Sequence, residues 1–141
     1  MKSLYLALPL TQIKTDAEKN EIRNLIRWFK ETFDVEILKW AFNTDTWTPE
    51  PVENIFDFDT EKVLRADLVI VFYPENEGSD GRGGEVVLRV QAGKPILAFK
   101  KRGVKVSRYP TDCLKKHGVN IEEYDRFEDV EKTVRKALEK E

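Results

Sequence analysis

The stretch Leu68-Val69-Ile70-Val71-Phe72-Tyr73 is the strongest strand signal in this sequence. It is continuously apolar and rich in β-branched and aromatic residues, which is typical of a central parallel strand covered on both faces. A polar, glycine-rich loop follows at 74–84, and the pattern then predicts a helix from about Gly84 to Ala92, closed by Gly93. A buried strand, a loop and a helix in this order indicate an α/β fold.

The rest of the chain alternates strands and helices in the same way. The apolar patterns predict further strands at 4–8, 35–38, 95–99 and 119–124. They predict helices at 16–33 with Thr15 as N-cap, at 57–66, after Pro110, and along the face formed by Phe127, Val130, Val134 and Leu138. Residues 41–56 lack periodicity and are predicted to form a long loop. We therefore expect a single domain over 1–141 with a flavodoxin-like, doubly wound sheet of five parallel strands, order 2-1-3-4-5, and helices on both faces.

Charge and cysteine content exclude several classes of partner. The chain has 24 Lys and Arg against 26 Asp and Glu, so its net charge is −2 and it carries no basic surface signal for nucleic acid or membrane. Its apolar N-terminal run is too short for a signal peptide or a membrane span. Cys113 is the only cysteine and His117 the only histidine, which excludes Cys/His metal sites and favours a reducing, cytoplasmic compartment.

The predicted topology indicates where a ligand binds. In doubly wound sheets, ligands bind beyond the carboxyl ends of the strands, at the point where the winding reverses. Here that point lies between the first and third strands, so the loops at 9–14 and 74–84 are expected to line the site.

The segment Ser79-Asp80-Gly81-Arg82-Gly83-Gly84-Glu85 contains the first candidate catalytic residue. Its glycines permit a sharp turn and a close approach to a ligand. Glu85 is expected in the first turn of the following helix, where the helix dipole keeps a carboxylate ionised, as a nucleophile requires. The simpler interpretation is that Glu85 is an ordinary helix N-terminal acid.

A second carboxylate, Asp59, is expected near the start of the helix that leads into the central strand. This places it at the same rim as Glu85, and a pair of carboxylates is what glycosyl transfer needs: one attacks the anomeric carbon and the other assists the leaving group. The alternative is that Asp59 only caps its helix. Asp67, directly before the central strand, is expected to be structural.

Taken together, these segments resemble the nucleoside 2-deoxyribosyltransferase family, and most closely its branch of 2′-deoxynucleoside 5′-phosphate N-hydrolases. The resemblance covers residues 4–99 and extends more loosely to the C-terminus. Its motifs are Leu4-Tyr5-Leu6-Ala7-Leu8-Pro9-Leu10, Asp59 placed eight residues before Asp67, Ser79-x-Gly81-x-Gly83-x-Glu85, and Ala92-Gly93-Lys94-Pro95.

The resemblance implies a mechanism. Glu85 would attack C1′ of a 2-deoxyribosyl group and form a covalent sugar–enzyme intermediate. Asp59 would protonate or hydrogen-bond the departing base, and Tyr5 would position Glu85 or the sugar. Water would then release deoxyribose 5-phosphate, without a metal or an organic cofactor.

The resemblance also implies a phosphate site and a homodimer. Ser79 and the amides near Gly81 and Gly83 would hold a 5′-phosphate. Ser107 resembles a serine that reaches the phosphate from the neighbouring subunit.

The sequence departs from this branch after the first strand. Leu8, Pro9 and Thr11 stand where the branch carries Gly, Ser and Arg, and Pro9 has no amide hydrogen to donate. Thr11, Gln12, Lys14 or Arg82 would therefore have to compensate in binding a phosphate.

Two further residues have both a functional and a structural interpretation. Asp80 matches an Asp that contacts a sugar hydroxyl in the transferase branch, or it is a solvated turn residue. Trp47, in the predicted long loop, stacks on a nucleobase or pins the loop.

Two alternatives to hydrolysis remain open. A nucleoside 2-deoxyribosyltransferase would use the same Glu85 and Asp59 but pass the sugar to a second base. A non-catalytic domain would bind or sense a nucleotide, or bind flavin, without turnover.

Overall fold

The computed structural model describes residues 1–75 and 82–140, and it has the α/β arrangement expected from the sequence. The strands are β1 Lys2–Ala7, β2 Val35–Ile37, β3 Phe42–Asn43, β4 Thr48–Pro49, β5 Leu68–Tyr73, β6 Ile96–Lys101 and β7 Ile121–Tyr124. The helices are α1 Asp16–Thr32, α2 Ile55–Arg65, α3 Arg82–Gln91, α4 Arg108–Lys116, the 3₁₀ turn η1 Phe127–Val130 and α5 Glu131–Glu139. None of the helices in this described part combines the length and apolarity needed to cross a lipid bilayer.

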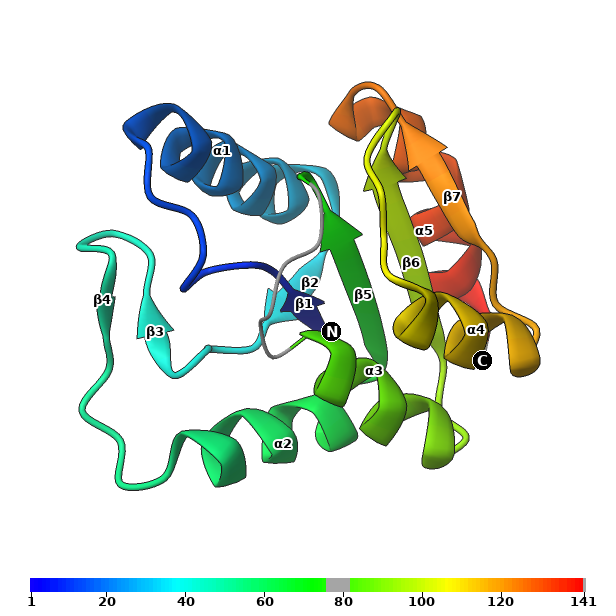
Figure 1. Ribbon diagram of the computed structural model, residues 1–141, viewed down its shortest axis with the longest axis horizontal. Coiled ribbons are helices and arrows are strands. Elements are labelled where there is room, and N and C mark those ends of the chain that lie inside the picture. Colours follow the sequence, from blue (N-terminus) through cyan, green and yellow to red (C-terminus); the bar gives the residue numbers. More distant parts are fainter. Residues whose placement is uncertain (76–81, 141) are drawn as a thin grey trace.

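The main sheet has five parallel strands in the order β2-β1-β5-β6-β7 (Figure 1). This confirms the predicted doubly wound order. Helices α1 and α5 cover one face of the sheet, and α2, α3 and α4 cover the other. The winding reverses between β1 and β5, so the carboxyl ends of these two strands lie side by side at one edge of the sheet.

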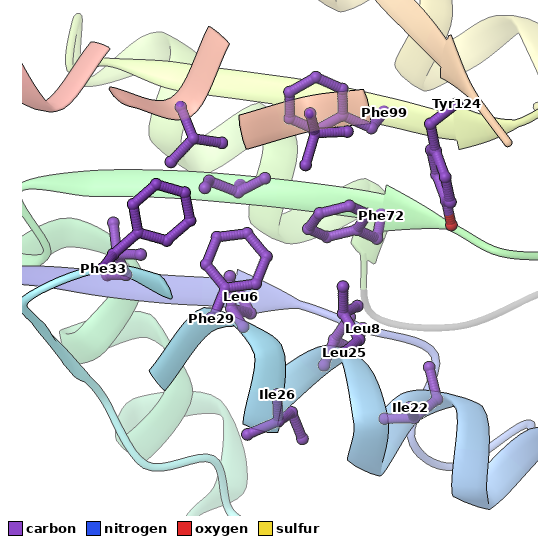
Figure 2. Close-up of a cluster of buried hydrophobic side chains, with 14 of the residues drawn as sticks. Leu6, Leu8, Ile22, Leu25, Ile26, Phe29, Phe33, Phe72, Phe99 and Tyr124 are labelled. Carbon is purple, nitrogen blue, oxygen red and sulfur yellow. The ribbon is translucent and has the colours of Figure 1, made fainter. Parts of the chain in front are cut away.

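The central strand β5 is buried on both faces, as its uninterrupted apolar sequence predicts. Leu68, Ile70 and Phe72 point into the core under α1 and α5, whereas the alternate residues point toward α2, α3 and α4. Phe72 lies at the centre of the first core, with its ring centroid 5.8 Å from Phe29, 5.5 Å from Phe99 and 5.8 Å from Tyr124 (Figure 2). Burial of each such ring stabilises the fold by about 1.5–3 kcal/mol.

Local caps fix several helix ends as predicted. The Thr15 side chain accepts a hydrogen bond from the amide of Glu18 at the start of α1. Gly93, after α3, has a φ of +69°, a conformation that glycine adopts readily, and its amide donates to the carbonyl of Val90.

The predicted loop at 41–56 contains a short antiparallel ribbon, which corrects that prediction. Strands β3 and β4 pair through the registers Phe42–Pro49 and Asn43–Thr48. The Asn43 side chain accepts hydrogen bonds from the amides of Asp45 and Thr46, which stabilises the turn between the strands. Two-residue strands are too short for sequence alternation to reveal them.

Two helices also begin earlier than predicted. Helix α2 begins at Ile55 because the Asn54 side chain caps the amide of Asp57, so Asp59 lies in the second turn and not at the start. Helix α3 begins at Arg82, so Gly83 is helical and not part of the preceding loop. The predicted first-turn position of Glu85 is confirmed.

Candidate active site

A cavity of about 290 Å³ opens at the carboxyl edge of the sheet, where the topology predicted a ligand site. Its polar lining consists of Tyr5, Thr11, Asp59, Arg82 and Glu85. Its apolar lining consists of Leu8, Leu10, Trp40, Ala41, Phe42, Pro49 and Ile55. The fold thus brings together four of the predicted site residues: Tyr5, Thr11, Asp59 and Glu85.

The Tyr5 hydroxyl donates a hydrogen bond of 2.5 Å to Oε2 of Glu85. Tyr5 lies on β1, and Glu85 lies in the first turn of α3. Tyr5 is only 2 % exposed. Burial, followed by the negative charges of Glu85 and Asp59, holds the pKa of Tyr5 far above its usual range. The phenol therefore stays protonated and fixes the Glu85 carboxylate in one orientation.

Asp59 is the second carboxyl group of the cavity. One of its oxygens accepts a hydrogen bond of 2.9 Å from the amide of Ala41, which holds the side chain against the segment that follows β2. Burial raises the pKa of Asp59, and this effect outweighs the opposing effects of the Ala41 amide and the Lys62 ammonium group. A carboxyl group that keeps its proton to higher pH is suited to act as a general acid.

Arg82 is 1 % exposed and also lines this cavity. Its Nη1 donates a 2.8 Å hydrogen bond to the carbonyl of Phe72, and its guanidinium lies 4.8 Å from the centroid of the Tyr73 ring. The sequence named Arg82 only as one of several groups that could compensate in phosphate binding. Its burial did not follow from the sequence, because the helix was expected to begin after it.

Trp40 and Phe42, not Trp47, supply the aromatic wall of the cavity. The Trp40 indole is fixed by a 2.6 Å hydrogen bond from Nε1 to the carbonyl of Leu6 on β1. Trp40 was not predicted as a site residue, although its position after a short strand at the carboxyl edge was an available signal.

Trp47 lies outside this lining and holds the β3–β4 ribbon against α1. Its Nε1 donates to the carbonyl of Ile13 at 3.3 Å, and its ring packs edge-on against Phe42. The cationic groups of Lys19 and Arg23 lie 5.8 and 5.3 Å from the ring centroid. These contacts agree with the structural interpretation of Trp47, in which its side chain holds the loop in place.

Two other described residues of the predicted binding site, Gly83 and Ser107, do not line the cavity. Ser79, Asp80 and Gly81 lie outside the described residues. Gly83 lies in the first turn of α3, and a Cβ added there would meet no atom within 4 Å. Ser107 is exposed at the N-cap position of α4.

The described residues, 1–75 and 82–140, contain no group of three or more His, Cys, Asp and Glu side chains arranged so that they could hold a metal ion.

Comparison with known proteins shows a shared fold at low sequence identity. No model of a known protein family matches the chain, and no curated protein matches its sequence. A conserved protein from Enterococcus faecalis V583 has a similar structure, with a TM-score of 0.69 and 16 % identity over 96 % of this chain and 98 % of that one.

Two further structures of known activity have the same fold. A CMP N-glycosidase from Clostridium botulinum superposes with a TM-score of 0.62 and 19 % identity, over 95 % of this chain and 99 % of that one. A 2-deoxyribosyltransferase from the psychrotolerant bacterium Bacillus psychrosaccharolyticus superposes with a TM-score of 0.58 and 18 % identity, over 92 % and 90 % of the two chains.

Proposed function

We propose that this chain is an enzyme of the nucleoside 2-deoxyribosyltransferase family that hydrolyses the N-glycosidic bond of 2′-deoxynucleoside 5′-monophosphates. The observation that carries the proposal is the pairing of Glu85, held by Tyr5, with the partly buried Asp59 across one cavity. The activities of the two similar structures, N-glycoside cleavage and deoxyribosyl transfer, support the same chemistry here.

In the first step, an oxygen of Glu85 attacks C1′ of the sugar as the bond from C1′ to the base nitrogen breaks. The bonding electron pair leaves with the base, and protonated Asp59 transfers its proton to the base. The sugar is then joined to Glu85 through a covalent bond. Tyr5 keeps the carboxylate aligned with C1′ through its hydrogen bond.

In the second step, the Asp59 carboxylate removes a proton from water while the water oxygen adds to C1′. The bond between C1′ and Glu85 breaks, and its electron pair returns to the carboxylate. The products are the free base and deoxyribose 5-phosphate, and the residues regain their starting protonation states.

The apolar wall suits a base. Trp40 and Phe42 offer flat surfaces on which a heterocycle can stack, and Asp59 lies in the same cavity, where it can reach a base nitrogen. A nucleobase seated there would leave its sugar facing Glu85.

We include a homodimer in the proposal. Ser107 is exposed and lies outside the cavity of its own chain, which suits a residue that contributes to the site of a partner subunit.

The test is incubation with the four common 2′-deoxynucleosides and their 5′-monophosphates, with free base as the readout. Wild-type protein is expected to release base, and Glu85→Gln is expected to release none. Glu122→Gln is the matched control, because it removes a carboxylate from the exposed surface of the edge strand β7. Absence of turnover on every compound would reduce the chain to a nucleotide-binding domain.

Transfer is the second candidate, and the likeness to the 2-deoxyribosyltransferase favours including it. The same incubations with a second free base distinguish the two reactions. A transferase makes a new deoxynucleoside, whereas a hydrolase gives the same yield of sugar whether or not the acceptor base is present.

A further inference from the structure

Another cavity, of about 310 Å³, lies between α1 and the segment 40–45 that follows β2, and we call it the α1 groove. Its lining consists of Arg23, Ile26, Arg27, Lys30, Trp40, Thr44 and Asp45. Trp40 also belongs to the wall of the active-site cavity, so the two cavities are neighbours. Three cationic side chains and one carboxylate make the α1 groove positive, whereas the active-site cavity contains two carboxyl groups and one guanidinium group.

The three cations form a row along one side of α1. Residues three and four positions apart lie on the same side of a helix, so the row runs from Arg23 through Arg27 to Lys30, over about 10 Å of the helix. Like charges at these spacings repel one another and weaken a helix. Among the residues that the structure describes, no salt bridge joins the row to a carboxylate. The row is therefore not explained by the stability of α1.

The arginines of this row are bound differently from other helical arginines of the chain. Three of those form a salt bridge with a carboxylate four residues away on their own helix: Arg65, Arg108 and Arg135. On α1, side-chain amides take this place. The Asn20 oxygen accepts a hydrogen bond of 3.0 Å from Arg23, and the Asn24 oxygen accepts one of 3.1 Å from Arg27. An amide oxygen orients a guanidinium group without neutralising it, so both arginines keep their full charge.

Arg23 also holds the opposite wall of the groove in place. Its Nε donates to the carbonyl of Thr44 at 2.8 Å, and its Nη2 donates to the carbonyl of Asp45 at 3.3 Å. These bonds fix the turn of the β3–β4 ribbon beside α1. Arg27 and Lys30 are exposed, and the bond to Asn24 uses one of the five N–H groups of Arg27. Arg27 and Lys30 are thus the members of the row that face a ligand most directly.

We propose that the α1 groove is a second ligand site, which binds a chain of two or three linked phosphates such as that of a nucleoside triphosphate. Phosphate oxygens accept charge-assisted hydrogen bonds from guanidinium and ammonium groups. A single phosphate reaches only part of the row, whereas a chain of phosphates extends along it. The Trp40 indole, held by its bond to the Leu6 carbonyl, offers a flat surface on which an attached nucleobase stacks. The site does not depend on the reaction proposed for the active-site cavity.

The first experiment measures the binding of inorganic tripolyphosphate by isothermal titration calorimetry at constant ionic strength. Wild-type protein is expected to bind it, and the double variant Arg27→Gln/Lys30→Gln is expected to bind it about 10- to 100-fold more weakly. Neither residue lines the active-site cavity, so this loss would locate the ligand in the α1 groove. Absence of binding by the wild-type protein would overturn the proposal.

The matched control is the double variant Lys132→Gln/Lys136→Gln. It removes the same charge from two exposed positions, four residues apart on α5, and it is expected to keep the wild-type affinity. An equal loss in both double variants would overturn the proposal, because affinity would then follow net charge alone. Circular dichroism checks folding, and Lys30→Gln alone, with an expected loss of about tenfold, replaces the double variant if that does not fold.

The second experiment compares tripolyphosphate with deoxyadenosine triphosphate and with inorganic phosphate. Tighter binding of deoxyadenosine triphosphate would identify a nucleotide as the ligand, and Trp40→Leu is expected to remove that advantage while tripolyphosphate still binds. Equal affinities for the two triphosphates would uphold the site and assign it to inorganic polyphosphate. Inorganic phosphate that binds as tightly as tripolyphosphate would overturn the proposal, because the length of the row would then have no effect.

Discussion

Asp59 and Asp67 lie eight residues apart, yet they occupy opposite edges of the sheet and differ in chemistry. At the amino edge, one Asp67 oxygen accepts hydrogen bonds from the amide (2.8 Å) and the hydroxyl (3.2 Å) of Ser3, and these bonds lower its pKa. At the carboxyl edge, Asp59 accepts one bond from an amide, and burial beside a cavity raises its pKa. The first acid is bound to the neighbouring strand, whereas the second lines the cavity and has the role of proton donor in the proposed reaction.

The two buried arginines of α3 repeat this contrast. Arg89 donates to the carbonyls of Pro95, Val63, Ala66 and Asp67, and it joins the amino ends of β5 and β6 to the end of α2. Arg82, two turns earlier, lines the active-site cavity. A cavity of about 460 Å³ lies at the amino edge, and the acid that lines it, Asp67, is hydrogen-bonded to Ser3.

The substitution Asp59→Asn tests the proposed proton-donor role of the acid at the carboxyl edge, and it is expected to have the largest effect. Loss of the proton donor is expected to lower kcat/KM by about 10²- to 10⁴-fold. The free energy of unfolding is expected to change little, because the charge that is removed is partly buried and therefore does not stabilise the folded state. Steady-state kinetics and urea denaturation measure the two effects, with Asp57→Asn on the same helix as the control. Full activity in Asp59→Asn would remove it from the mechanism.

Arg89→Met tests the amino edge. The carbonyls that it binds would lose their donor, and the free energy of unfolding is expected to fall by about 3 kcal/mol. The kcat of the protein that remains folded is expected to be unchanged. Urea denaturation gives the first quantity, and Arg65→Met, at an exposed site, is expected to change it by less than about 0.5 kcal/mol. A loss of kcat without a loss of stability would contradict the structural role.

The pH dependence of the reaction sharpens the contrast between the two acids. Because the pKa of Asp59 is raised, its proton-donating form persists above the usual Asp range and is lost as pH rises through the raised pKa. Above that pKa, kcat/KM is expected to fall about tenfold per pH unit. The pH profile of Asp59→Asn should lack this decline. If the decline persists in the variant, another group causes it.

Asp67→Asn is expected to have the smallest effect. A lowered pKa means that the carboxylate stabilises the fold above its unfolded-state pKa and loses this effect as pH falls through the folded-state value. At neutral pH the variant is expected to lose about 1 kcal/mol, and the difference from wild type should disappear in acid. Thermal unfolding across pH measures it. A difference that is constant with pH would rule out the ionised carboxylate as its cause.

The sequence was sufficient to predict the sheet because its information is local and periodic. The unbroken run of β5 and the alternation of strands with helices predicted the strand order, and the topology predicted the edge at which Tyr5, Asp59 and Glu85 meet. These predictions need only burial patterns and chain connectivity.

The rest of the site depends on contacts between distant segments, which no local pattern encodes. Trp40 becomes a cavity wall because its indole binds the carbonyl of Leu6, thirty-four residues earlier. Arg82 is buried because the Phe72 carbonyl and the Tyr73 ring receive it. Deciding between the two interpretations of Trp47 required knowing that its indole binds the Ile13 carbonyl and that cations of α1 lie over its ring.

The β3–β4 ribbon forms a separate two-stranded sheet, yet its Phe42 and Pro49 line the cavity. Mutation or loop exchange in this ribbon can reshape the chamber without disturbing any strand pairing of the main sheet. Natural divergence and laboratory redesign can therefore both act on the ribbon. The shape of the cavity can change there while the proposed catalytic acids and the sheet beneath them stay constant.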